Sequence, residues 1–148
     1  MALATIRRLR YQGNMATKRI LASGVFDVLH PGHLHYLAEA KRHGDHLAVI
    51  VTSDAQAARE KRPPRHPAAE RARRVAALGA VDEAVVGAEP YDLVGMVREL
   101  QPDVIALGHD QPFDPAELAR TLQAAGLTVQ VVRCSARPGA RTSDLPSE

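Results

Sequence analysis

The chain has 148 residues, of which 45% are hydrophobic, so it is long enough for one folded domain and too short for two ordinary ones. Only 3% of the residues are aromatic, which argues against a nucleic-acid partner bound by base stacking. The formal net charge of +2 suits small anions as well as nucleic acid and decides little alone. The single cysteine, Cys134, excludes an internal disulfide and favours a reducing, cytoplasmic setting. No stretch approaches the roughly 20 apolar residues of a membrane span, so no membrane association is expected.

Strand-like and helix-like runs alternate through the chain. Residues 1–17 carry three arginines without an apolar segment after them, so we expect a basic, disordered extension there and one domain at 18–148. Strands are predicted at 20–23, 47–52, 83–86, 104–107 and 127–132. Helices are predicted at 32–43, 67–78, 92–100 and 115–125. This alternation predicts the α/β class, as a single Rossmann-like domain with a five-stranded parallel sheet and helices on both faces.

The turn after the first predicted strand, residues 24–33, reads Gly-Val-Phe-Asp-Val-Leu-His-Pro-Gly-His. His30 and His33 are three positions apart and therefore share one face of a helical turn. Pro31 suits the first position of a helix, where its missing N–H is not needed. A helix that starts after a strand exposes backbone N–H groups, so the turn predicts a phosphate site. A bound triphosphate would favour protonation of both imidazoles.

Two plainer interpretations of these histidines are solvated residues at a helix start and a metal pair. A metal site needs a third ligand, and His35 points away from His33, so no metal site is expected. The chain contains neither a G-x-G-x-x-G nor a G-x-x-x-x-G-K-[ST] pattern, which leaves phosphate binding to this turn. Three other histidines are expected at the surface: His43, His46 and His66.

The same ten residues resemble the G-[TV]-F-D-x-x-H-x-G-H signature of the cytidylyltransferase-like nucleotidyltransferase superfamily. Residues 67–82 resemble its P-x-x-x-R…V-x-A-L-x-x-V-D segment, so the likeness covers nearly the whole chain after residue 18. It implies a Rossmann-like domain that transfers a nucleotidyl group from a nucleoside triphosphate to a phosphorylated acceptor. By this resemblance, His30 and His33 would stabilise the transition state. The nucleotide would be bound by Val25, Phe26, His30, Pro31, Gly32 and His33.

The run Leu-Gly-His-Asp-Gln-Pro-Phe-Asp at 107–114 is similar to the L-G-x-D-Q-x-F-D form of the archaeal-type FAD synthetases, the FMN adenylyltransferases of that superfamily. The resemblance implies transfer of AMP from ATP to FMN, giving FAD and pyrophosphate. It also implies a divalent metal, Mg²⁺ or another, held mainly by substrate and water. Asp110 would lie at the ribose or base of the nucleotide, and its alternative is a plain turn residue after a strand.

Three further residues take roles from the resemblance. Lys61 would neutralise charge at the α-phosphate, with a solvated charge in the exposed loop 60–67 as the equal alternative. Asp27 and Arg71 would bind the acceptor. For Arg71 the alternative is a local ion pair.

Thr142 and Ser143 loosely resemble the second signature of the superfamily, in which a hydroxyl caps a terminal helix beside the phosphates. The sequence stops at residue 148 without room for that helix. Either this tail has degenerated or another subunit supplies the contact. Because many relatives are dimers, a homodimer is compatible with the resemblance.

Two alternatives to FAD synthesis stay open at this stage. The nearer is cytidylyl or adenylyl transfer to another acceptor, such as glycerol 3-phosphate, ethanolamine phosphate or a heptose phosphate. The more distant is a non-catalytic module that binds nucleotides or nucleic acid, prompted by the arginines of the extension. The residues do not decide between ATP and CTP, because pocket shape and backbone groups read the base.

Overall fold

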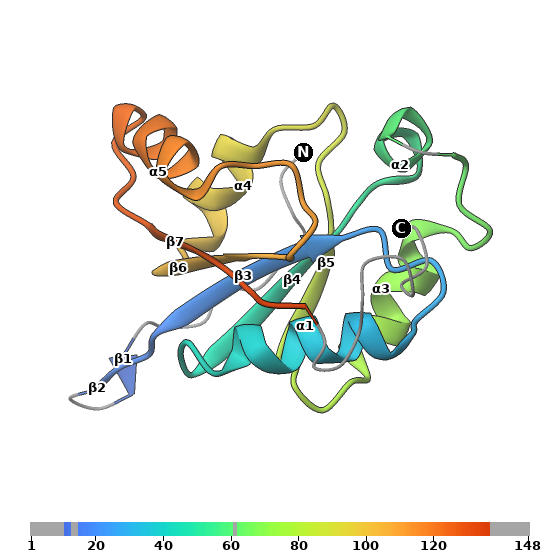
Figure 1. The fold of residues 1–148 in the computed structure, drawn as a ribbon, viewed down its shortest axis with the longest axis horizontal. Coiled ribbons are helices and arrows are strands. Elements are labelled where there is room, and N and C mark those ends of the chain that lie inside the picture. Colours follow the sequence, from blue (N-terminus) through green and yellow to red (C-terminus); the bar gives the residue numbers. More distant parts are fainter. Residues whose placement is uncertain (1–10, 13–14, 61, 137–148) are drawn as a thin grey trace.

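A parallel sheet of five strands forms the centre of the computed structural model, which describes residues 11–12, 15–60 and 62–136 (Figure 1). Along the chain the strands are β3 (Arg19–Gly24), β4 (His46–Val51), β5 (Glu83–Val86), β6 (Val104–Leu107) and β7 (Gln130–Arg133). Their order across the sheet is β5-β4-β3-β6-β7, and every neighbouring pair is parallel. The predicted fold class is therefore confirmed.

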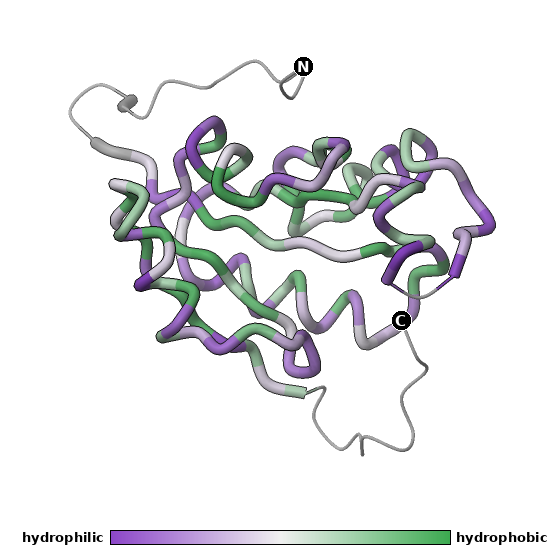
Figure 2. Tube along the Cα trace, turned by 90° about the horizontal axis from the view of Figure 1, so that it is seen from above, coloured by the Kyte–Doolittle hydropathy of each residue, from purple (hydrophilic) through white to green (hydrophobic). Residues whose placement is uncertain are grey.

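Helices cover both faces of this sheet. Helices α1 (Pro31–Lys41) and α3 (Ala68–Ala76) lie on one face, and α4 (Leu93–Leu100) and α5 (Pro115–Ala124) lie on the other (Figure 1). Successive side chains of a strand point to opposite faces, so β3 sends Ala22 into the core under α1 and Leu21 into the core under α4. Figure 2 shows the consequence, hydrophobic strands enclosed by segments with hydrophilic outer sides.

The ends of α5 follow the signals in the sequence. Asp114 accepts a hydrogen bond from the Glu117 N–H at 3.0 Å, and Pro115 takes the first helical position. Gly126, with φ of +86°, lies just beyond the end of the helix. The Leu127 N–H still bonds to the Leu122 carbonyl, which is why the last strand begins three residues later than predicted.

Helix α2 (Asp54–Glu60) was not predicted and lies in a segment expected to be loop. It has only seven residues and buries Ala57 alone, so its hydrophobic pattern is weak. A local signal was nevertheless present, because Ser53 and Gln56 have the Ser-x-x-Gln spacing of a capping box. In the structure, the Ser53 hydroxyl accepts a hydrogen bond from the Gln56 N–H at 3.1 Å.

The segment 1–17, predicted to be disordered, contains two short strands. They are β1 (Tyr11–Gln12) and β2 (Met15–Ala16), which pair antiparallel with Tyr11 opposite Ala16. The register of these four residues is that of a hairpin. The arginines of the extension lie outside the described residues.

A buried group of charged and polar side chains lies at the amino ends of β3, β4 and β5. His46 Nε2 lies 2.6 Å from Glu83 Oε1, and an Arg19 guanidinium nitrogen lies 3.4 Å from the same oxygen. His46 is 6% exposed, so its predicted surface position is wrong, because adjacent strands bring Glu83 and Arg19 around it. The hydrogen bond from His46 lowers the pKa of Glu83, against the opposing effect of burial.

The order of the strands reverses at β3, from which the chain first builds β4 and β5 and later β6 and β7. Strand β3 pairs with β6 only at Ile20–Val104 and Leu21–Ile105. Beyond these pairs the carboxyl halves of the two strands lack mutual ladder bonds. In open parallel sheets, ligands bind at such a reversal point.

Candidate active site

The turn between β3 and α1 is shaped by Gly24 and Phe26. Phe26 has a φ of +53°, a left-handed conformation that is uncommon for a residue with a side chain. Its ring folds back over Gly24, where a Cβ would lie 2.8 Å from two ring carbons. Phe26 is 2% exposed, so burial of its ring holds the strained turn in place.

The two histidines cap helix α1 at its amino end. His30 is the N-cap, and its Nδ1 accepts a hydrogen bond from the Gly32 N–H at 3.1 Å. His33 Nδ1 accepts a hydrogen bond from the His30 N–H at 3.3 Å, which completes a capping box built from imidazoles. A Cβ on Gly32 would lie 2.9 Å from His30 Cε1. Glycine is therefore needed for the His30 ring to reach the backbone.

The same cap determines the hydrogen-bonding roles of the rings. Because each Nδ1 accepts from a backbone N–H, we assign the proton of each neutral ring to Nε2. Protonation of both rings would break both cap hydrogen bonds, because a protonated Nδ1 cannot accept one. It would also add two positive charges at the positive end of a helix. This geometry argues against the doubly charged pair expected from the sequence. It favours two neutral Nε2–H donors.

The histidines are also packed together. The rings of His30 and His33 are stacked with centroids 3.7 Å apart, and Phe26 meets His33 edge-on at 5.1 Å. His33 is 6% exposed. Two rigid, adjacent imidazoles thus face the same pocket.

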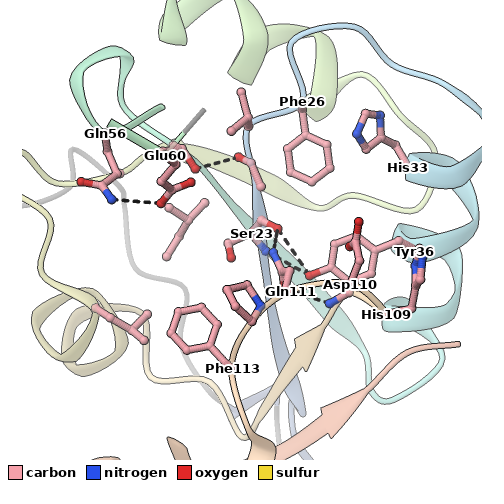
Figure 3. Close-up of a pocket in the computed structure, with 18 of the residues that line it drawn as sticks. Ser23, Phe26, His33, Tyr36, Gln56, Glu60, His109, Asp110, Gln111 and Phe113 are labelled. Atoms are coloured by element: carbon pink, nitrogen blue, oxygen red, sulfur yellow. Dashed lines mark hydrogen bonds between the residues drawn. The ribbon is translucent and has the colours of Figure 1, made fainter. Parts of the chain in front are cut away.

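That pocket has a volume of about 510 Å³ and opens at the carboxyl ends of β3, β4, β5 and β6 (Figure 3). Its size suits a nucleotide-sized ligand. It brings together six of the predicted nucleotide-binding residues: Val25, Phe26, His30, Gly32, His33 and Asp110. Pro31 starts α1 as predicted but is not among the residues that line it.

Two side chains without a role predicted from the sequence fill the gap between β3 and β6. The Tyr36 hydroxyl donates to the Ala106 carbonyl at 2.6 Å and accepts from the Ser23 N–H at 3.2 Å. Gln111 Nε2 donates to the Ser23 carbonyl at 3.1 Å, and its Oε1 accepts from the Gly108 N–H at 2.8 Å. Both side chains replace missing ladder bonds, and both line the pocket. Gln111 belongs to the recognised 107–114 run, whereas no pattern distinguished Tyr36.

Arg133, at the end of β7, holds the loop after β6. Its guanidinium donates to the carbonyls of Gly108 and Gln111, each at 2.9 Å, and to the carbonyl of Phe113. Three carbonyls on one planar cation make the loop rigid. Asp110, in this loop, is exposed at the pocket.

Arg71 is fully buried and does not line the pocket. Its guanidinium donates to the carbonyls of His66, Val25 and Thr52 and pairs with Asp54 at 2.7 Å. The structure thus favours the local ion pair over a contact with the acceptor. Arg71 positions the loops that follow β3 and β4.

Asp27, the other predicted acceptor-binding residue, faces the loop before α3. Its carboxylate accepts hydrogen bonds from the Arg65 N–H at 2.8 Å and the His66 N–H at 3.0 Å. Burial raises the pKa of Asp27, but these bonds and the His66 side chain outweigh it and lower the pKa. Asp27 is likewise not among the lining residues of the pocket.

Three predicted phosphate contacts, Lys61, Thr142 and Ser143, lie outside the described residues.

Within the described ranges, no group of three or more His, Cys, Asp or Glu side chains could hold a metal ion. A resident metal centre made by these side chains therefore does not fit. In the same part of the chain, no helix is both long and apolar enough to cross a membrane.

The fold and the site define a Rossmann-like α/β protein that presents a histidine-capped helix start to a nucleotide-sized pocket. The chain belongs to the cytidylyltransferase-like family, whose model matches residues 21–147. It is 45% identical over 119 residues to a protein of Archaeoglobus profundus named FAD synthase, covering 80% of this chain and 76% of that protein. A Natronomonas pharaonis protein of the same name is 47% identical over 122 residues, covering 82% of this chain and 86% of that protein.

A solved structure is similar as well. The crystal structure of a lipopolysaccharide core biosynthesis protein from Thermoplasma volcanium matches with a TM-score of 0.80 and 42% sequence identity. The match covers 82% of this chain and 99% of that one. The names of these relatives thus mention two different biosynthetic products.

Proposed function

We propose that this protein is an FMN adenylyltransferase, which transfers AMP from ATP to FMN and releases FAD and pyrophosphate. Nucleotidyl transfer is supported by the two capping histidines, since their Nε2–H donors and the start of α1 suit a triphosphate. The choice of FMN as acceptor is supported by relatives named FAD synthase that share 42–47% of aligned residues with this chain.

The reaction is a displacement at phosphorus. An oxygen of the FMN phosphate attacks the α-phosphorus of ATP, and the bond from that phosphorus to the oxygen bridging to the β-phosphorus breaks. The electron pair of this bond leaves with pyrophosphate. The protein supplies positioning and charge stabilisation rather than a nucleophile.

His30 and His33 act as neutral donors to the phosphate oxygens on which charge develops. Such contacts strengthen as the transition state forms, and they need no rearrangement because the cap already orients both rings. Asp110 is proposed to contact the nucleotide from the rigid loop after β6. Lys61, Thr142 and Ser143 stay predicted phosphate contacts on the strength of the resemblance.

A divalent metal enters this scheme as part of the nucleotide substrate. In MgATP the ion neutralises phosphate charge and is held by phosphate oxygens and water. This assignment agrees with the chemistry of the described side chains, which offer no ligand cluster of their own. The reducing cytoplasm inferred from the single cysteine is the proposed setting.

The test is synthesis of FAD by the purified chain supplied with ATP, Mg²⁺ and FMN. Parallel reactions replace ATP by CTP, and FMN by glycerol 3-phosphate, ethanolamine phosphate or a heptose phosphate. Pyrophosphate release should be fastest with ATP and FMN. Faster turnover with another pair would reject the flavin assignment. A heptose phosphate is included because the Thermoplasma volcanium structure is named as a lipopolysaccharide core biosynthesis protein.

Binding of ATP without turnover on any acceptor would instead support the non-catalytic alternative. The His33→Ala variant, which should still bind ATP but transfer AMP far more slowly, separates a true reaction from a contaminating activity.

A further inference from the structure

The aromatic residues of this chain are concentrated in one place. The sequence contains two Phe, three Tyr and no Trp, and four of these five residues line the pocket: Phe26, Tyr36, Tyr91 and Phe113. Phe26 is buried within the turn between β3 and α1, and Tyr36 bridges β3 and β6. Structural roles therefore account for only two of the four.

Tyr91 and Phe113 are different, because both are exposed to solvent. Tyr91 is 43% exposed and Phe113 is 37% exposed, and they are among the few large apolar side chains exposed in the described part of the chain. They come from separate segments, the loop before α4 and the loop before α5. Exposed rings contribute little to folding, so their presence in one pocket points to a ligand that covers them.

The pocket has two chemically distinct sides. Phe26, His33 and Tyr36 belong to the α1 side of the sheet, where the turn between β3 and α1 lies. On the other side, Ile50 and Met96 belong to the core beneath α4 and reach the pocket. Figure 3 shows Phe113 across Ser23 from His33.

The apolar side is completed by one residue that follows β5 and one at the start of α4. Leu93 and Ala88 pack against the same core as Met96 and line the pocket. The polar residues His109 and Asp110 instead follow β6 near Tyr36 (Figure 3). Adenylyl transfer to FMN involves two planar ring systems, adenine and isoalloxazine. The two sides of the pocket offer these rings unequal surroundings.

We propose that the isoalloxazine ring of FMN lies on the apolar side of the pocket against Tyr91 and Phe113, which select the flavin acceptor. This inference rests on the proposed function and assigns its acceptor subsite. The isoalloxazine is the larger and, at its dimethylbenzene edge, the more apolar of the two rings. Adenine is left with the polar side of the pocket, where His109 and Asp110 lie. Small acceptors such as glycerol 3-phosphate would leave both aromatic rings exposed.

Hydrogen bonds fix the backbone on which the two rings are carried. Arg133 donates to the carbonyl of Phe113 and to two other carbonyls of that loop. Tyr91 directly precedes Asp92, whose carboxylate caps α4 by accepting from the Gly95 N–H at 3.0 Å. The part of the Tyr91 side chain that the protein covers, and the nearby Glu60 carboxylate, raise the pKa of Tyr91, so its phenol stays protonated and uncharged. A neutral ring on a fixed backbone suits stacking on a flavin.

The experiment measures FMN binding by quenching of flavin fluorescence, and separately the KM values for FMN and ATP. Tyr91→Ala and Phe113→Ala should each weaken FMN binding and raise the KM for FMN by roughly tenfold. Binding of MgATP and its KM should change less than twofold. Tyr91→Phe should bind FMN nearly as well as wild type, because the ring is retained.

Leu34→Ala is the matched control, since Leu34 is 47% exposed and lies outside the pocket. It should not change FMN binding, and thermal melts should confirm that all variants fold. Wild-type FAD synthesis with an unchanged KM for FMN in both alanine variants would reject this subsite and leave the proposed function standing. A loss confined to ATP would also reject it. FMN binding that depends on both rings, without FAD synthesis, would support the subsite and reject the proposed function.

Discussion

The Tyr36 hydroxyl lies 2.6 Å from the Ala106 carbonyl oxygen and so joins α1 to β6 where β6 has separated from β3. The same hydroxyl accepts from the Ser23 N–H at 3.2 Å. One side chain therefore satisfies backbone groups of both strands at the edge of the pocket. This bridge links the two strands at the place where their ladder bonds have ended.

Replacing Tyr36 by Phe tests that bridge. The variant keeps the ring but leaves polar groups of Ser23 and Ala106 short of a partner, which should lower the free energy of unfolding by about 1–2 kcal/mol. Urea denaturation measures this difference. Tyr91→Phe is the control and should leave the free energy of unfolding unchanged. Equal losses in the two variants would show that the hydroxyl of Tyr36 has no special role.

Gly32→Ala tests whether the imidazole cap needs a glycine. The new Cβ would lie 2.9 Å from His30 Cε1 and 3.1 Å from its Nδ1, so the ring must move away from the backbone N–H that it caps. Loss of the cap should destabilise the protein by about 1 kcal/mol and lower kcat for FAD synthesis by tenfold or more. Gly79→Ala provides the comparison, because a Cβ there meets nothing within 4 Å. Similar kinetics in both variants would disprove the steric argument.

His33→Ala removes one of the two proposed donors to the phosphates. We expect kcat to fall by roughly a hundredfold or more while KM changes little, since the contact strengthens in the transition state. His43→Ala, which alters a histidine that does not line the pocket, should behave as wild type. An unchanged kcat in His33→Ala would remove His33 from the mechanism.

The neutral-donor assignment for these histidines makes its own prediction about pH. If Nδ1 of each ring serves the cap, as its contacts indicate, activity does not require an imidazolium. The wild-type kcat should therefore stay level from about pH 7 to pH 9, above the usual titration range of histidine. A decline in kcat across this interval would show that a charged ring is needed instead.

The sequence predicted the parts of this protein that depend on short-range patterns. The turn at 24–33 carries its histidines, proline and glycine in a fixed local spacing, and α5 carries its cap and its stop in the same way. Contacts that depend on distant strands were not predictable. Tyr36 meets Ala106 across 70 positions, and no spacing rule links such residues.

The burial of charged and polar residues was not predictable for the same reason. The residues around Arg71 in the sequence have the composition of a surface helix. Arg71 is nevertheless buried, because carbonyls from two distant loops surround its guanidinium. From the sequence alone, His46 looks like a polar residue just before a strand. In the structure, β3 and β5 place Arg19 and Glu83 beside it. Burial of a charge becomes favourable only when its partners are assembled.

Glu83→Gln tests that buried group through its response to pH. The pKa of Glu83 is lowered in the folded protein, first by the hydrogen bond from His46, so its carboxylate stabilises the fold above its ordinary pKa of about 4.5. At pH 7 the variant should lose about 3 kcal/mol of unfolding free energy, because Arg19 keeps a buried charge without its counter-ion.

As the pH falls below about 4.5 and then through the folded-state pKa, wild-type Glu83 becomes protonated and resembles the glutamine of the variant. The difference in unfolding free energy should therefore shrink, which urea denaturation at a series of pH values would show. Glu70→Gln is the matched control, since its pair with Arg74 is exposed on α3 and should contribute less than about 0.5 kcal/mol. A difference for Glu83→Gln that is independent of pH would mean that shape, rather than charge, holds Glu83 in place.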